Sequence, residues 1–120
     1  MPMKGQLMKQ ILLTAMIGLW ATGAVAHSPL AATTPANEAT VAEVPSEIMM
    51  DFKGDIRLTR VSMTHAETHT ANLDLDGFDG FVSRYAIPLQ GMGSGDYLIE
   101  WRGLGADGHA LNGSFTFTVE

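Results

Sequence analysis

Four histidines are the residues of this sequence best suited to chemistry. They stand at positions 27, 65, 69 and 109, and the 120 residues contain no cysteine. The absence of cysteine excludes thiolate metal sites, thiol catalysis and stabilising disulfides. A metal ion bound by this chain would therefore be held by histidine, carboxylate, methionine or backbone groups.

His27 becomes chemically distinctive if the chain is cut directly before it. An N-terminal histidine offers a free amine and its own imidazole Nδ1, and together these two nitrogens can chelate one metal ion. Such a pair favours Cu(II), which stands at the top of the divalent affinity order and prefers tetragonal N/O ligation. Taken alone, this feature is weak evidence, because some residue must follow every signal peptide.

Residues 1–26 have the features of an export signal in the expected order. Two lysines, Lys4 and Lys9, give a positive n-region, and the mostly apolar stretch from Ile11 to Trp20 carries no charge. Ala24-Val25-Ala26 then supplies the small-x-small sequence that signal peptidase accepts. We expect residues 1–26 to be cleaved and residues 27–120 to form one small domain; the alternative is an uncleaved amphipathic or buried helix.

Asp107 and His109 form the second candidate feature. Side chains two apart point to the same side of an extended strand, and Gly108 would let the backbone bend if the segment is a loop. The pair would add a carboxylate oxygen and an imidazole nitrogen to the donors of His27, giving a set suited to square-planar Cu(II). The alternative is an ordinary Asp-Gly turn before the last strand.

His65 and His69 have the spacing of metal ligands on a helix, but their surroundings do not support a helix. On one continuous strand they would share a face about 13 Å apart, too far for a single ion. We expect them to be solvated loop histidines. The alternative is an auxiliary metal site that involves Met63, His65 or His69.

The charge of the expected domain excludes one class of partner. Loss of Lys4 and Lys9 leaves five of the seven Lys and Arg residues against thirteen Asp and Glu, a formal net charge of −8. A domain this acidic is unsuited to neutralising the phosphates of nucleic acid. It is compatible with a cation as partner, although most acidic surfaces are simply solvated.

The segments that must position these residues read as strands. No part of residues 27–120 has a convincing helical period, and about seven short apolar or alternating segments are separated by turn residues. This pattern is typical of an antiparallel sandwich or barrel. The expected details are a turn at Lys53-Gly54-Asp55, a bulge near Thr59 and Arg60, a strand over 71–76, and a closing strand that buries Phe115, Phe117 and Val119.

The whole mature chain resembles the CopC copper-resistance family. The likeness rests on His27, on the Thr34-Pro35-Ala36 turn, and most strongly on the C-terminal segments. Those segments are Gly95-Asp96-Tyr97, Trp101-Arg102, Ala106-Asp107-Gly108-His109 and Gly113 to Val119. The resemblance implies an immunoglobulin-like Greek-key β-sandwich in the bacterial periplasm, with Cu(II) bound by the amine and imidazole of His27, by Asp107 and by His109.

Two departures from the family pattern stand out. Some members carry a Cu(I) site in a methionine-rich loop, whereas Met92 stands alone in its loop and the adjacent Met49 and Met50 point to opposite faces of a strand. Members also commonly have an acidic residue near the copper soon after the strand that ends at Phe52. In this sequence the nearest acid is Asp55.

The resemblance implies a copper carrier or buffer rather than an enzyme. Its partners would be the copper ion and an inner-membrane copper transporter or another periplasmic copper protein. One alternative is an immunoglobulin-like interaction module without metal. Another is a copper-dependent oxidase or mono-oxygenase, which the charged Asp107 ligand disfavours because it would stabilise Cu(II) against reduction.

Overall fold

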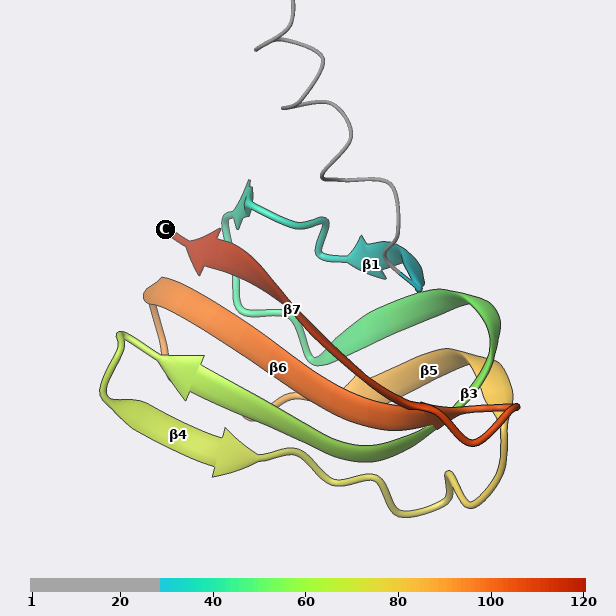
Figure 1. Cartoon of the computed structure of the whole chain (residues 1–120). Coiled ribbons are helices and arrows are strands. Elements are labelled where there is room, and N and C mark those ends of the chain that lie inside the picture. The colour runs from blue at the N-terminus through green and yellow to red at the C-terminus, as the bar shows by residue number, and fades with distance from the viewer. Residues whose placement is uncertain (1–28) are drawn as a thin grey trace, which may run out of the picture.

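The computed structural model describes residues 29–120, and every regular element in that range is a β-strand (Figure 1). The strands are β1 Leu30–Thr34, β2 Ala39–Val41, β3 Glu47–His65, β4 His69–Asn72, β5 Val82–Pro88, β6 Gly95–Gly105 and β7 Ala110–Val119. This part of the chain contains no helix that could cross a membrane. The expected all-β class with seven strands is confirmed. The predicted signal peptide and His27 lie outside the described residues.

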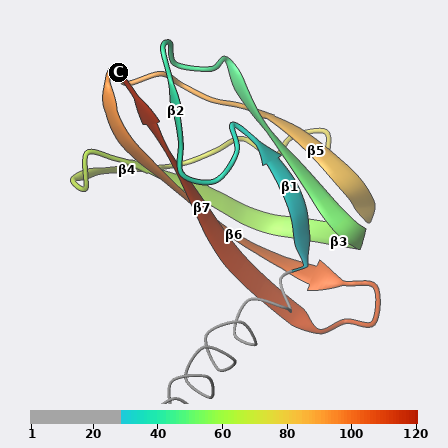
Figure 2. The ribbon, with the colours of Figure 1, turned by 90° about the horizontal axis from the view of Figure 1, so that it is seen from above.

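The 19-residue strand β3 organises the domain because its two halves belong to different layers. The first half pairs antiparallel with β1 and β5, and the second half pairs with β4 and β6. β7 extends the second layer beyond β6, and the short β2 pairs in parallel with the end of β7. Figures 1 and 2 show the resulting twisted sandwich, an immunoglobulin-like Greek key with the path β1-β3-β6-β7-β2.

The predicted turn at Lys53-Gly54-Asp55 is wrong, because β3 continues through these residues. The pairing of β3 with β5 shifts between Asp51 and Ile56, and the pairing with β6 begins at Ile56. Strands that pass from one layer of a sandwich to the other do so through bends of this kind. The three residues are exposed at the crossing, so they have the composition of a turn without forming one.

The predicted bulge near Thr59 and Arg60 is confirmed. Leu58 pairs with Gly103 and Arg60 pairs with Arg102, so Thr59 is the extra residue of β3. Its hydroxyl donates to the carbonyl oxygen of Arg102 at 3.3 Å. Because one extra residue reverses the face on which the following side chain stands, the bulge places Arg60 on the outer side of the sheet.

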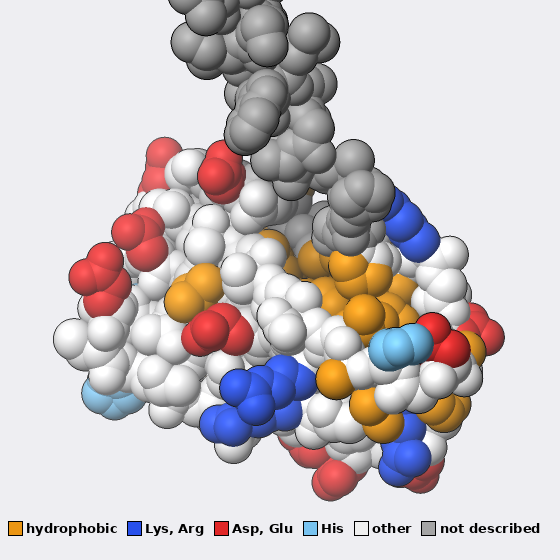
Figure 3. All heavy atoms as spheres, viewed as in Figure 1, with side chains coloured by type: hydrophobic (Ala, Val, Ile, Leu, Met, Phe, Trp, Pro, Cys, Tyr) orange, Lys and Arg blue, Asp and Glu red, His pale blue; other side chains and the backbone are white. Residues whose placement is uncertain are grey.

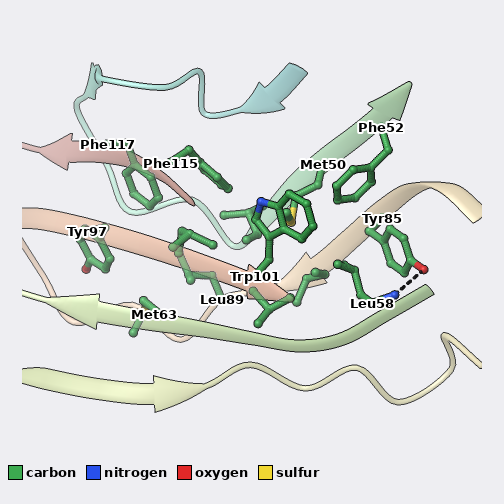
Figure 4. Packing of buried hydrophobic residues seen from close by; sticks show 14 of the residues in the cluster. Met50, Phe52, Leu58, Met63, Tyr85, Leu89, Tyr97, Trp101, Phe115 and Phe117 are labelled. Atoms are coloured by element: carbon green, nitrogen blue, oxygen red, sulfur yellow. Dashed lines mark hydrogen bonds between the residues drawn. The ribbon is translucent and has the colours of Figure 1, made fainter. Parts of the chain in front are cut away.

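The core lies between the two layers and is wholly apolar apart from the polar atoms of its Tyr and Trp side chains (Figure 4). The predicted burial of Phe115, Phe117 and Val119 is confirmed, and Trp101 faces inward while Leu98 is half-buried on the other face. The buried set is Ile48, Met50, Phe52, Ile56, Leu58, Val61, Met63, Tyr85, Ile87, Leu89, Tyr97, Ile99, Trp101, Phe115, Phe117 and Val119.

The strand predicted over residues 71–76 is shorter than expected, since β4 ends at Asn72. The alternation beyond that point has a different cause. Leu73 and Leu75 are half-buried and pack against the core from an irregular segment. The alternation of apolar residues here therefore reflects contact of Leu73 and Leu75 with the core, although the segment is not a strand.

Candidate metal centre

Asp107 and His109 lie in the turn between β6 and β7. The Gly108 N–H donates to the Gly105 carbonyl and the Gly105 N–H donates to the His109 carbonyl, both at 2.9 Å. Gly108 has a φ of 85°, a left-handed conformation that glycine adopts without steric cost. The result is a three-residue hairpin loop of the kind that ends in a left-handed residue, and it holds the two side chains on a short, closed segment.

The two side chains are in direct contact. Asp107 Oδ2 lies 2.7 Å from His109 Nδ1, and Asp107 Oδ1 accepts a hydrogen bond from the backbone N–H of His109 at 3.1 Å. The side chains are also open to solvent, with 68% of Asp107 and 82% of His109 exposed. The structure thus brings together two of the three residues predicted as ligands, and leaves His109 Nε2 on the far side of the ring from the carboxylate.

Each member of this pair changes the protonation of the other. The side-chain hydrogen bond from His109 lowers the pKa of the Asp107 carboxyl below its ordinary value of 3.8. The same hydrogen bond, reinforced by charge attraction, raises the pKa of the His109 imidazole above 6.5. A metal ion that approaches Nδ1 of His109 therefore competes with a proton that Asp107 helps to hold.

A shallow, open cavity of about 410 Å³ adjoins the turn, and the beginning of the described chain forms part of its lining. Its lining includes Pro29, Lys53, Asp55 and Asp107. The N–H of Lys53 donates to the Pro29 carbonyl at 2.9 Å, which fixes Pro29 against the crossing segment of β3. Figure 2 shows the start of β1 at the same end of the sandwich as the β6–β7 turn.

The donors supplied by residues 29–120 do not complete a metal site. Within that range, no group of three or more His, Cys, Asp or Glu side chains could hold a metal ion. Asp107 and His109 supply one carboxylate and one imidazole, and the predicted third ligand, His27, lies outside the described residues. Asp55, the acid noted in the sequence as nearest to the strand end, shares the cavity with Asp107.

The comparison with protein families decides the relationship that the sequence suggested. A family model described as the CopC domain matches residues 30–120, most of the chain. The chain belongs to the CopC family. A copper resistance protein C of Escherichia coli is 29% identical to this chain over an alignment 123 positions long, which covers 93% of this chain and 96% of that protein.

Solved CopC structures share the fold. The crystal structure of CopC from Methylosinus trichosporium OB3b matches with a TM-score of 0.65 at 21% identity, covering 78% of this chain and 94% of that one. PcoC, a methionine-rich copper resistance protein from Escherichia coli, matches with a TM-score of 0.54 at 27% identity, covering 79% and 100%. Both cover nearly the whole solved chain, so the similarity extends over the entire domain.

Within residues 29–120, most methionines of this CopC chain take part in packing. Met50 and Met63 are fully buried in the core, while Met49, next to Met50, is half-buried on the opposite face as predicted. Met92 is 39% exposed, and its backbone N–H donates to the hydroxyl of Tyr97 at 3.0 Å. Burial of Met63 removes it from the auxiliary site that the sequence left open.

The prediction that His65 and His69 are loop residues is wrong. His65 is the last residue of β3 and pairs directly with His69, the first residue of β4. The half-buried ring of His65 packs on Tyr97 with centroids 4.7 Å apart, and its Nε2 donates to the Ser94 carbonyl at 2.7 Å. The predicted separation of about 13 Å assumed one continuous strand. A hairpin instead makes the two residues cross-strand neighbours.

No pattern in the sequence pointed to the hydrogen bond between Pro29 and Lys53. The Lys53 N–H donates and the Pro29 carbonyl accepts, so both partners are backbone groups and the identity of the side chains does not indicate the bond. The residue types at the crossing favoured a turn, which would have moved Lys53 and Asp55 away from the site. Only the continuous β3 brings them beside Asp107.

Proposed function

We propose that this chain is an exported Cu(II)-binding protein that carries or buffers copper and performs no catalysis. Membership of the CopC family and the likeness to copper resistance proteins support copper as the cargo. The observation that carries the proposal is the exposed Asp107–His109 pair on its three-residue loop, next to the beginning of the described chain. We further propose that residues 1–26 are the export signal and that residues 27–120 work in the periplasm.

The proposed ligands are the amine and imidazole of His27, the imidazole of His109 and the carboxylate of Asp107. Support comes from chain length, because two residues span at most about 7 Å and Pro29 shares a cavity with Asp107. Three nitrogens and one oxygen in a plane are the donors and the geometry that Cu(II) prefers. His27 would thus add the nitrogens that residues 29–120 lack.

Metal binding must rearrange the contact between Asp107 and His109. If both side chains ligate through Nδ1 and Oδ2, the ion takes the place of the proton between them. If His109 ligates through Nε2, its Nδ1–H can keep donating to Asp107, and the carboxylate then orients the ring and raises its basicity. Our proposal is the first arrangement, and the two differ in whether an amide at position 107 still supports binding.

The proposed partners are proteins that deliver or accept copper, namely an inner-membrane copper transporter or another periplasmic copper protein. An exposed site at the end of a hairpin suits transfer, because a partner's ligands can approach it without prior unfolding of the domain. The negative charge of Asp107 also stabilises Cu(II) relative to Cu(I), which suits storage better than oxygen activation.

The decisive experiment compares two forms of the protein from residue 27 onward. Both begin with His27, and the N-terminal amine is free in one form and acetylated in the other. We expect acetylation to weaken Cu(II) binding by about 100-fold or more, since chelation by the free amine makes binding of the second donor intramolecular. Calorimetric titration gives the affinity, and electron paramagnetic resonance gives the number of nitrogen ligands.

The matched control is His69→Gln in the protein that begins with His27. His69 is an exposed histidine on another hairpin, so its loss should leave the affinity and the spectrum unchanged. Equal affinity of the free-amine and acetylated forms would show that the amine is not a ligand, and the proposed site would then be wrong.

A further inference from the structure

Arg60 and Arg102 face each other across β3 and β6 on the outer side of the second layer. They are directly paired in the register, and both are exposed. The bulge at Thr59 creates this pairing, because without the extra residue Thr59 would stand opposite Arg102. Like charges directly opposite each other destabilise an antiparallel pair. The bulge therefore maintains an arrangement that lowers the stability of the sheet.

These two arginines are also left without a carboxylate partner. Residues 29–120 carry five Lys and Arg against thirteen Asp and Glu, so acids are available in excess. Arg84 on β5 is paired with Asp51 at 3.0 Å, whereas neither Arg60 nor Arg102 has an ion pair within the described range. Arg60 donates through Nε to Asn72 Oδ1 at 3.2 Å. This bond leaves the two Nη groups of its guanidinium available to a ligand.

A cavity of about 430 Å³ lies over this pair, between β3, β4, β6 and β7. Its volume is in the range of small-molecule sites. Figure 3 views this face and shows a contiguous Lys and Arg patch at mid-sheet with an acidic side chain beside it. Besides the two arginines, the lining consists of Ser62, Thr70, Glu100, Trp101, Asn112 and Gly113.

The chemistry of this lining selects a ligand. Planar guanidinium groups bind a carboxylate with paired, charge-assisted hydrogen bonds. Two arginines and Glu100 give the cavity a formal charge of +1, which matches one carboxylate better than a multiply charged anion. Glu100 is an acceptor only, so it complements a hydroxyl or amino group on the same ligand.

We propose that this cavity is a binding site for a small monocarboxylate that also carries a hydroxyl or amino group. The carboxylate lies between Arg60 and Arg102, and the donor group faces Glu100. Bound ligand neutralises the repulsion between the two arginines, so binding also stabilises the fold. Neither Asp107 nor His109 lines this cavity, and the proposal therefore does not depend on copper.

The test is a nuclear magnetic resonance titration of metal-free protein from residue 27 onward, which contains the whole described fold. Lactate, acetate and phosphate are added separately at constant ionic strength. We expect lactate to give saturable shifts of the Ser62, Thr70 and Asn112 amides and to bind more tightly than acetate. Arg60→Gln and Arg102→Gln should each weaken lactate binding by about tenfold or more, the value of one charge-assisted hydrogen bond.

Two further variants separate a built site from general electrostatics. Arg84→Gln removes the same charge from the other layer and should bind lactate as the unaltered protein does. Arg102→Lys retains the charge without the planar fork and should bind with intermediate affinity, and it also tests the site if the glutamine variants fail to fold. Thermal melting should show that folded Arg60→Gln and Arg102→Gln proteins are no less stable than the parent.

Three results would overturn the proposal. Linear, unsaturated shifts for every anion would show only non-specific screening. An equal loss of lactate binding in Arg84→Gln would show that net charge and not the cavity is responsible. Saturable phosphate binding as tight as that of lactate would remove the monocarboxylate assignment.

Discussion

Replacement of Tyr85 by phenylalanine should destabilise the domain far more than the loss of one surface hydroxyl would. Tyr85 on β5 is completely buried. Its hydroxyl donates to the Ile56 carbonyl. The same hydroxyl accepts from the Leu58 N–H at 3.1 Å, the contact drawn as a dashed line in Figure 4. Both partners belong to β3 immediately after it changes layers, so this hydroxyl ties the end of one layer to the beginning of the other.

The magnitude follows from what the substitution removes. Phenylalanine keeps the ring contacts with Phe52 and Phe78, so almost no apolar packing is lost. Each intramolecular hydrogen bond contributes about 1 kcal/mol, and a buried group left without a partner costs about 1–3 kcal/mol. We therefore expect Tyr85→Phe to lower the free energy of unfolding by about 2–4 kcal/mol. Domains of this size have about 5–15 kcal/mol in total.

Urea unfolding followed by circular dichroism measures this free energy. The slope with denaturant should be unchanged, since the folded surface is the same. Tyr97→Phe is the matched control: its hydroxyl also makes two hydrogen bonds, to the Met92 N–H and the Gly93 carbonyl. Those partners lie in an exposed loop where water can replace the hydroxyl, so we expect a loss of about 1 kcal/mol or less. A loss in Tyr85→Phe no greater than in Tyr97→Phe would refute the reasoning.

Two further substitutions test the packing and the candidate site. Gly113→Ala would place its Cβ 2.8 Å from Trp101 Cζ2, and overpacking of this kind should cost about 1–3 kcal/mol in thermal melts. Gly54→Ala, with no atom within 4 Å, is its control, and equal losses would exclude the clash as the cause. Asp107→Asn should return the raised pKa of His109 toward 6.5 in a proton resonance titration, and an unchanged pKa would contradict the role of the ion pair. The ion pair should make the parent more stable than Asp107→Asn, and this advantage should be full between pH 3.8 and 6.5. It should fade at lower pH as Asp107 is protonated through its lowered pKa, and at higher pH as His109 loses its proton through its raised pKa.

The sequence predicts those strands that keep one face buried throughout. β7 alternates cleanly because Phe115, Phe117 and Val119 all enter the same core. The same pattern is missing from β3 at residues 53–55, because the strand has no buried face where it changes layers. Period-two alternation reports burial, and a strand that is locally exposed on both sides leaves no such signal.

The β3–β4 hairpin shows a second limit of the sequence. Its turn contains Ala66 and Glu67 with φ of 51° and 65°, conformations for which glycine or asparagine is the usual sign. Without that sign, the sequence indicated a loop between two strands but not a hairpin tight enough to pair His65 with His69. Tertiary contacts, including the hydrogen bond from the Ala66 N–H to the Asp96 carbonyl at 2.9 Å, hold the turn in this conformation.

In the candidate site, too, a contact between residues close in sequence could be predicted, whereas a contact between distant residues could not. The contact of Asp107 with His109 could be predicted because the two residues are two positions apart on one short loop. The approach of Pro29 to Asp107 depends on the path of β1 and on the crossing of β3, and no local pattern encodes either. Here the family resemblance gave the expectation, and the cavity that both residues line agrees with it.

The same distinction between local and distant contacts determines what modification of the His27 amine would change. Asp107 and His109 are held at the end of a hairpin of ten residue pairs, so their positions do not depend on the N-terminus. Acetylation adds no residue before His27 but converts its amine into an amide, whose nitrogen lone pair is delocalised. The expected loss of copper affinity is therefore chemical and not positional. A glycine placed before His27 supplies a new free amine one residue from the imidazole, so it should lower the affinity less than acetylation does, and equal losses in the two forms would show that bulk at the N-terminus is the cause.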